Sequence, residues 1–188
     1  MTQVLHGYSP RLDVYSIDET FVDLSGFGER MEAHAARMRQ AVRTQVGIPT
    51  CVGIAPTKTL AKLANYAAKK NPIFGSVCNL MGDTVRDYVM RRIPVGEIWG
   101  VGGATQAKLM TQGIKVAAEL RDLPLPLARK IGGVVLERLV AELRGIVCID
   151  FEDVPPQRKG MAVTRSSGTP MTTFDVLAQA VTAHATRA

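Results

Sequence analysis

The chain has 188 residues, of which 46% are hydrophobic and 21% charged, as in globular rather than disordered proteins. No apolar run approaches the ~20 residues of a membrane span, and the N-terminus lacks the basic and apolar segments of a secretory signal. Three widely spaced cysteines, Cys51, Cys78 and Cys148, form no CxxC pair. They predict neither a disulfide framework nor a zinc site, and we expect a reducing, cytoplasmic compartment.

The charge balance is basic, with 23 Lys and Arg against 17 Asp and Glu and a net charge of +6. No acidic residue occurs between residues 33 and 82, a stretch that holds seven basic ones. Such a segment has a positive local field and favours partners that carry phosphate. A solvated basic face without a partner explains the same pattern about as well.

The first 80 residues alternate short strands with helices. Strands are predicted at residues 12–17, 21–24, 50–55 and 75–80, and helices at 29–46 and, after a Thr57 cap, to about residue 70. After residue 82 the pattern becomes helix upon helix to about residue 145. Residues 150–160 read as a linker with two prolines, followed by a short extended piece and a helix from about residue 173.

Two adjacent carboxylates, Asp18 and Glu19, separate the first two strands. Carboxylate oxygens suit Mg²⁺, and two such ions can stabilise the attacking and leaving oxygens of a phosphoryl transfer. A solvated turn is the commoner explanation of adjacent acids. Because neighbours in an ideal strand point to opposite faces, both can line one site only if the chain turns there.

A row of lysines follows one side of the helix that begins after Thr57. At about 100° per residue, Lys58, Lys62 and Lys69 fall within ~40° of one another, opposite the apolar positions. The row predicts ammonium groups that bind anions, and we assign Lys58 and Lys62 to DNA binding. Simple solvation of the row is the commoner alternative.

A glycine-bearing loop, with Gly100 and Gly102, precedes a predicted helix that carries Lys108, and a second turn follows at Gly113. Glycines allow close backbone approach, and a helix start presents free N–H groups to a phosphate. The arrangement is similar to a helix–hairpin–helix that contacts nucleic-acid backbone without reading bases. We therefore predict that Gly100, Gly102 and Lys108 bind DNA, the alternative being an ordinary helical turn.

Several motifs, in order, resemble those of one family. Residues 15–24 (YSIDETFVDL) and 52–65 (VGIAPTKTLAKLAN) resemble motifs of the Y-family translesion DNA polymerases. With AAKK at 67–70, IWGVG at 98–102 and VLER at 135–138, the chain is most similar to the UmuC branch, which forms the catalytic subunit of the bacterial SOS mutagenic polymerase. The resemblance extends over roughly residues 9–168.

The resemblance implies an α+β fold with four parts. They are the later part of a palm domain at 1–80, a helical thumb with the helix–hairpin–helix at 81–149, a linker at 150–162, and the start of a little-finger domain at 163–188, whose first strand would lie at 163–166. It implies that Asp18 and Glu19 bind catalytic Mg²⁺ and that Lys69 contacts the incoming deoxynucleoside triphosphate. Asp23 is expected to be structural.

The implied partners are those of an error-prone polymerase in the bacterial cytoplasm. They are damaged primer–template DNA, bound without sequence preference, deoxynucleoside triphosphates, UmuD-type subunits, the RecA filament and the sliding clamp. The tail that carries clamp-binding segments in the family does not occur in this sequence, and no membrane partner is expected.

Departures from the family pattern limit these expectations. The strand pattern Asp-x-Asn-x-Phe-Tyr-Ala-Ser with another metal-binding Asp is not found, nor is the fingers domain, and Thr20 and Ser167 replace the usual Ala and aromatic residue. The chain therefore looks like an internal piece of such a polymerase, expected to be inactive alone. A non-catalytic DNA-binding accessory remains an alternative that the retained Asp18 and Glu19 disfavour. An unrelated palm-like enzyme such as a cyclase is disfavoured by the thumb-like hairpin.

Overall fold

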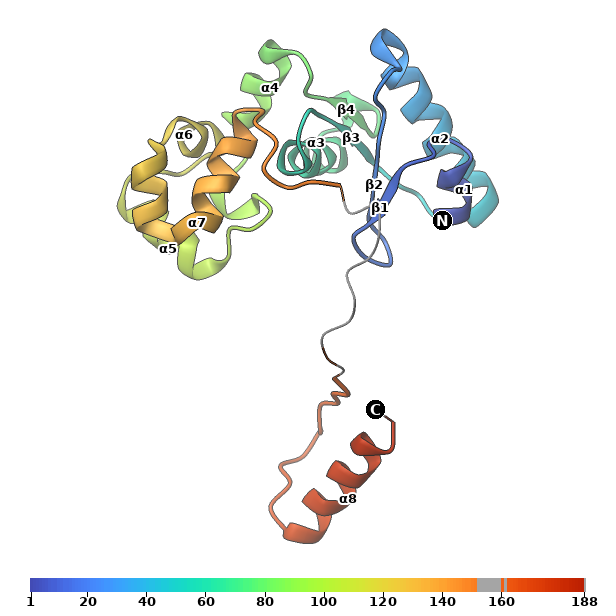
Figure 1. The fold of residues 1–188 in the computed structure, drawn as a ribbon, viewed down its shortest axis with the longest axis vertical. Helices are drawn as coiled ribbons and strands as arrows, with labels where there is room; N and C mark the ends of the chain where they lie inside the picture. The colour runs from blue at the N-terminus through green and yellow to red at the C-terminus, as the bar shows by residue number, and fades with distance from the viewer. Residues whose placement is uncertain (152–159, 161, 188) are drawn as a thin grey trace. The chain divides into compact units, whose positions relative to one another are not determined.

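The computed structural model describes residues 1–151, 160 and 162–187. The chain divides into two units, residues 1–153 and 154–188, and each is considered by itself. The fold mixes helices with two small sheets, as Figure 1 shows. Among the described residues no helix is both long and apolar enough to pass through a membrane.

The N-terminal part of the first unit is a hairpin packed beside two helices. Strands β1 (Leu12–Val14) and β2 (Thr20–Val22) pair antiparallel, with Val14 opposite Thr20. Around them lie α1 (Thr2–His6), the 3-10 turn η1 (Gly28–Arg30) and α2 (Met31–Val46). Their small core consists of Leu5, Met38 and Val42 with partly buried neighbours. Sequence patterns did not predict α1, which is too short for a clear period.

The next part is a strand–helix–strand unit. Strands β3 (Val52–Ile54) and β4 (Val77–Asn79) are parallel, and α3 (Lys58–Lys70) with the 3-10 turn η2 (Pro72–Phe74) connects them. The predicted cap is confirmed, since the Thr57 hydroxyl accepts from the N–H of Leu60 at 3.3 Å. The helix packs directly on the strand at Gly53, where an added Cβ would lie 2.2 Å from the Ala61 carbonyl oxygen.

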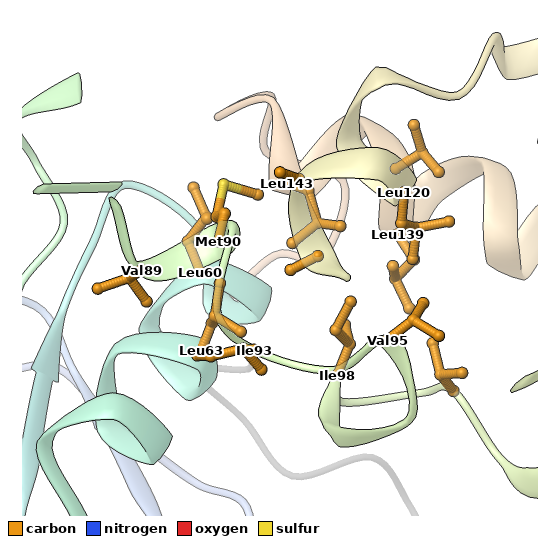
Figure 2. Close-up of a cluster of buried hydrophobic side chains, with 14 of the residues drawn as sticks. Leu60, Leu63, Val89, Met90, Ile93, Val95, Ile98, Leu120, Leu139 and Leu143 are labelled. Atoms are coloured by element: carbon orange, nitrogen blue, oxygen red, sulfur yellow. The ribbon is translucent and has the colours of Figure 1, made fainter. Parts of the chain in front are cut away.

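The rest of the first unit is helical. It comprises α4 (Asp83–Met90), η3 (Val95–Glu97), α5 (Gly103–Thr111), α6 (Ala117–Asp122) and α7 (Leu125–Leu143), which is interrupted at Gly132 and Gly133. Its core is continuous with that of α3. Figure 2 shows Leu60 and Leu63 of α3 in one cluster with Val89, Met90, Leu139 and Leu143. The hydrophobic core therefore crosses the expected palm–thumb boundary at residues 80 and 81 without a break.

A buried carboxylate joins the end of α7 to the start of α3. Glu142 is fully buried and accepts from the N–H groups of Thr59 at 3.0 Å, Cys148 at 2.8 Å and Ile149 at 3.0 Å. The Thr57 hydroxyl also donates to the Glu142 carbonyl at 2.9 Å. A negative charge is favourable at a helix N-terminus, where N–H groups lack helical partners. Glu142 therefore fixes both α3 and the chain that leaves α7.

The second unit contains one helix, α8 (Phe174–Ala185), close to the prediction. The expected strand at 163–166 is wrong: these residues have no strand structure. A strand needs a neighbour for its backbone groups, and the described part of this unit provides no other strand. Most of the predicted linker lies outside the described residues.

We expect Glu142→Ala to lower the free energy of unfolding by about 3 kcal/mol or more, because it leaves buried N–H groups without an acceptor. The matched control is Glu137→Ala on the same helix, whose carboxylate forms a 3.3 Å ion pair with the largely exposed Arg129. That change should lower it by no more than ~1 kcal/mol. Urea denaturation of both variants measures the difference. Equal losses of stability would contradict the role of Glu142 in joining α7 to α3.

Candidate functional site

The two predicted carboxylates lie on a tight turn between β1 and β2. The N–H groups of Tyr15 and Ser16 both donate to the Glu19 carbonyl oxygen, at 3.1 and 3.0 Å. The chain thus leaves extended geometry, which removes the alternation that would separate neighbouring side chains. Asp18 and Glu19 both line one open cavity of about 1380 Å³. The requirement that the chain turn at this point is met.

Glu19 is paired with a lysine of α3. The Lys62 ammonium lies 2.5 Å from a carboxylate oxygen of Glu19. The same ammonium lies over the rings of Tyr15 and Trp99, 5.3 and 5.9 Å from their centroids. Side-chain exposure is 20% for Lys62 and 41% for Glu19. The pair is therefore partly shielded yet open to the cavity.

Asp18 is exposed and stays ionised readily. Its carboxylate accepts a 2.7 Å hydrogen bond from the Ser16 hydroxyl. This bond, with smaller contributions from the charges of Lys62 and Lys69, lowers the pKa of Asp18 below its usual value. An ionised carboxylate with open lone pairs is the form that a cation binds.

Three aromatic side chains connect the turn to the helical part. Tyr15 and Trp99 meet edge to face at 5.4 Å, and Phe21 lies about 6 Å from each of them. The Trp99 indole N–H donates to the Tyr15 hydroxyl at 3.2 Å. No sequence pattern predicted this cluster. Its members are separated by up to 84 positions, and no local period links them.

Lys58 does not offer a free ammonium group, which corrects the expectation of an exposed lysine row. It is 8% exposed and forms a buried ion pair with Asp13 while donating to the Asp150 carbonyl. The rings of Phe21 and Phe151 lie 5.2 and 5.3 Å away. The periodicity placed Lys58 and Lys62 on one face correctly, but it could not show that the hairpin covers that face.

Lys69 lies at the exposed C-terminal end of α3. It lines the same cavity as Asp18 and Glu19. The structure thus brings five of the predicted site residues to one cavity: Asp18, Glu19, Lys58, Lys62 and Lys69. Carboxylates and lysines therefore line the same space, which are the groups that a cation and a phosphate would each need.

The glycine-bearing loop does not line the cavity that holds the two carboxylates. Gly100, Gly102 and Lys108 are exposed, and none of them is among the residues that line the cavity. Gly100 has φ of +90°, which favours glycine, and Gly102 caps α5. The second turn at Gly113 has φ of +78°, after which Ile114 is buried. The glycine turns and the helix between them are present, whereas the helix–hairpin–helix arrangement and its role in DNA binding stay predictions.

The oxygen ligands that the carboxylate turn offers are of the kind that a hard divalent cation prefers. Mg²⁺ is commonly held by one or two carboxylates, with waters and substrate phosphates completing the shell. Asp18 and Glu19 supply such oxygens at the edge of a cavity that Lys69 also lines. Within the described ranges no group of three or more His, Cys, Asp or Glu side chains is suited to a metal. The turn therefore provides only part of the coordination shell of such a cation.

Comparison with known proteins shows which proteins the chain is similar to. Residues 1–66 match the impB/mucB/samB family. MucB of Escherichia coli is 42% identical over 187 residues, which is 98% of this chain and 44% of MucB. UmuC of Salmonella typhimurium is 39% identical over 182 residues, 95% of this chain and 43% of UmuC. The chain contains an impB/mucB/samB domain and is homologous to MucB and UmuC, of whose lengths it spans less than half.

Solved structures agree in fold. The insertion ternary complex of Dbh DNA polymerase is 25% identical with a TM-score of 0.60, over 76% of this chain and 42% of that one. A DinB family error-prone DNA polymerase from Sulfolobus solfataricus gives a TM-score of 0.64 at 23% identity, over 81% of this chain and 46% of that one. The resemblance to Y-family DNA polymerases, inferred from motifs, is confirmed.

We expect Ser16→Ala to raise the pKa of Asp18, because it removes the hydrogen bond that contributes most to the lowering. A group with a lowered pKa favours the folded state above its unfolded pKa, and this contribution is lost as the pH falls through the folded pKa. Carboxyl carbon NMR titration checks the shift. Ser25→Ala is the control, since Ser25 holds down the pKa of Asp23 instead; an unchanged Asp18 titration in Ser16→Ala would contradict the assignment.

Proposed function

We propose that this chain is the metal- and DNA-binding part of an error-prone Y-family DNA polymerase that acts in translesion synthesis. The observation that carries the proposal is the shared cavity, on which Asp18, Glu19 and Lys69 meet. Homology to MucB and UmuC supports it, as does the fold of the Dbh DNA polymerase. UmuD-type subunits, the RecA filament and the sliding clamp are partners proposed by family alone.

Within this proposal each residue has a separate task. Asp18 and Glu19 hold Mg²⁺, which would supply positive charge for the transferred phosphoryl group. Lys69 neutralises part of the triphosphate charge from the end of α3. Gly100 and Gly102 allow the DNA backbone to approach the start of α5, and Lys108 adds a charge on the same helix. Lys62, which is paired with Glu19, adds a second ammonium at the same cavity.

The DNA-binding role predicts a weak, salt-dependent affinity without sequence preference. Lys108→Glu should weaken binding to the same extent on unrelated duplexes and reduce the salt slope, since one phosphate contact is lost. Fluorescence anisotropy titrations at several salt concentrations measure both quantities. Arg30→Glu, with the same charge change on the exposed η1 turn, is the control. Binding that prefers a sequence, or equal losses in both variants, would count against the hairpin.

Primer extension by this 188-residue chain alone is expected to be undetectable. Two-metal transfer needs carboxylates for both ions, and among the described residues no group of three or more His, Cys, Asp or Glu side chains is placed to hold a metal. The assay combines purified chain, Mg²⁺, deoxynucleotides and a primed template. Extension that disappears in Asp18→Ala would refute this expectation, whereas extension that persists in Asp18→Ala would identify a contaminating polymerase.

A non-catalytic DNA-binding accessory is the second candidate function. The observation in its favour is the same incomplete carboxylate set. It predicts that Asp18→Ala leaves DNA affinity unchanged with and without Mg²⁺, whereas a polymerase site predicts that Mg²⁺ changes the affinity for primed DNA through Asp18. The anisotropy assay with a primed template and a deoxynucleotide separates the two.

A further inference from the structure

We infer that Lys62 is the resident counter-ion of the carboxylate turn, and that a divalent cation must displace it from Glu19 in order to bind. This inference deepens the proposed function and rests on its assignment of Asp18 and Glu19 as cation ligands. It gives Lys62 a role distinct from a simple DNA contact.

The first argument is geometric. The Lys62 ammonium lies 2.5 Å from a Glu19 carboxylate oxygen, which is the distance of a direct, charge-assisted hydrogen bond. A cation bound between Asp18 and Glu19 would approach the same carboxylate, one of whose oxygens already accepts from the ammonium. Two positive charges at that separation also repel strongly in a partly shielded site. Lys62 and a divalent cation therefore compete for Glu19.

The second argument concerns where the ammonium would go. Lys62 already lies over the rings of Tyr15 and Trp99, and aromatic faces attract a cation without needing a carboxylate. These rings hold each other through the 3.2 Å Trp99–Tyr15 hydrogen bond. Lys62 also lines the cavity. A displaced ammonium thus stays beside the site, where it can meet phosphate.

The third argument is that the protein gains from the pairing when no metal is present. Asp18 and Glu19 are adjacent anions, and Lys62 reduces their mutual repulsion on a hairpin of only two three-residue strands. Lys58 and Asp13 form a second, more buried pair one helical turn earlier. The hairpin is therefore attached to α3 without a metal, and cation binding exchanges one charge for another.

The experiment uses Tb³⁺ as a probe for divalent-cation sites that oxygen ligands form. Terbium emission is sensitised by nearby indole and phenol rings, and Trp99 and Tyr15 lie beside Lys62. Lys62→Met should tighten Tb³⁺ binding by about three- to tenfold, because the cation no longer displaces an ammonium. Competition with Mg²⁺ should show the same direction. Lys70→Met, an exposed lysine at the end of the same helix, should leave the affinity nearly unchanged.

The outcomes are distinguishable. Tighter binding in Lys62→Met but not in Lys70→Met supports the inference. Equal or weaker binding in a folded Lys62→Met, with wild-type emission that Asp18→Ala abolishes, overturns the counter-ion role and leaves the proposed metal site standing. The absence of any emission that depends on Asp18 overturns both. Circular dichroism checks folding, and Lys62→Gln, which keeps a polar end, replaces Lys62→Met if that variant does not fold.

Discussion

Two lysines one turn apart on α3 attach the carboxylate-bearing hairpin to the rest of the protein. Lys58 pairs with Asp13 of β1, and Lys62 pairs with Glu19 at the hairpin turn. Among the described residues β1 pairs only with β2, and β3 only with β4. Among these residues no ladder between the two sheets aligns the hairpin. Charge pairing, the aromatic cluster of Tyr15, Phe21 and Trp99, and the packing of Leu12 and Val22 on the small core do so instead. The position of Asp18 and Glu19 therefore depends on α3.

The rigidity of α3 in turn depends on contacts from distant parts of the chain. Its first turn is held by Glu142 of α7, and its apolar side is embedded in the core shared with α4 and α7. A buried carboxylate is tolerated because three backbone N–H groups donate hydrogen bonds to it. The same residue fixes Cys148 and Ile149, and Lys58 holds the Asp150 carbonyl just beyond. One helix thus aligns both the hairpin and the exit of the chain from α7.

Local patterns were sufficient for most of the helices and strands between residues 12 and 145, whereas the roles of the site residues stay predictions. The Thr57 cap, the helix to Lys70 and the turn at Asp18 and Glu19 each follow from neighbours in the sequence. What the patterns missed depends on contacts between distant residues. The burial of Lys58 needs a hairpin some 45 positions away, and a strand predicted at 163–166 has no pairing partner in the described residues. Intrinsic propensity indicates which secondary structures a segment can adopt, whereas its neighbours in space decide which of them it does adopt.

The cavity beside the hairpin is lined by residues of β2, β3 and α2, among them Met38 and Val42 of α2. The buried hydroxyl of Thr20 lies on β2 without a hydrogen-bond partner among the described residues. The strands of the hairpin keep apolar contact through Leu12 and Val22, which pack on Leu5, Met38 and Val42, whereas the Lys62–Glu19 ion pair holds the turn itself to α3. Ion pairs lose energy only gradually with distance. They therefore hold the turn less rigidly than a sheet ladder would, and this suits a turn at which, as proposed above, a metal ion replaces a lysine.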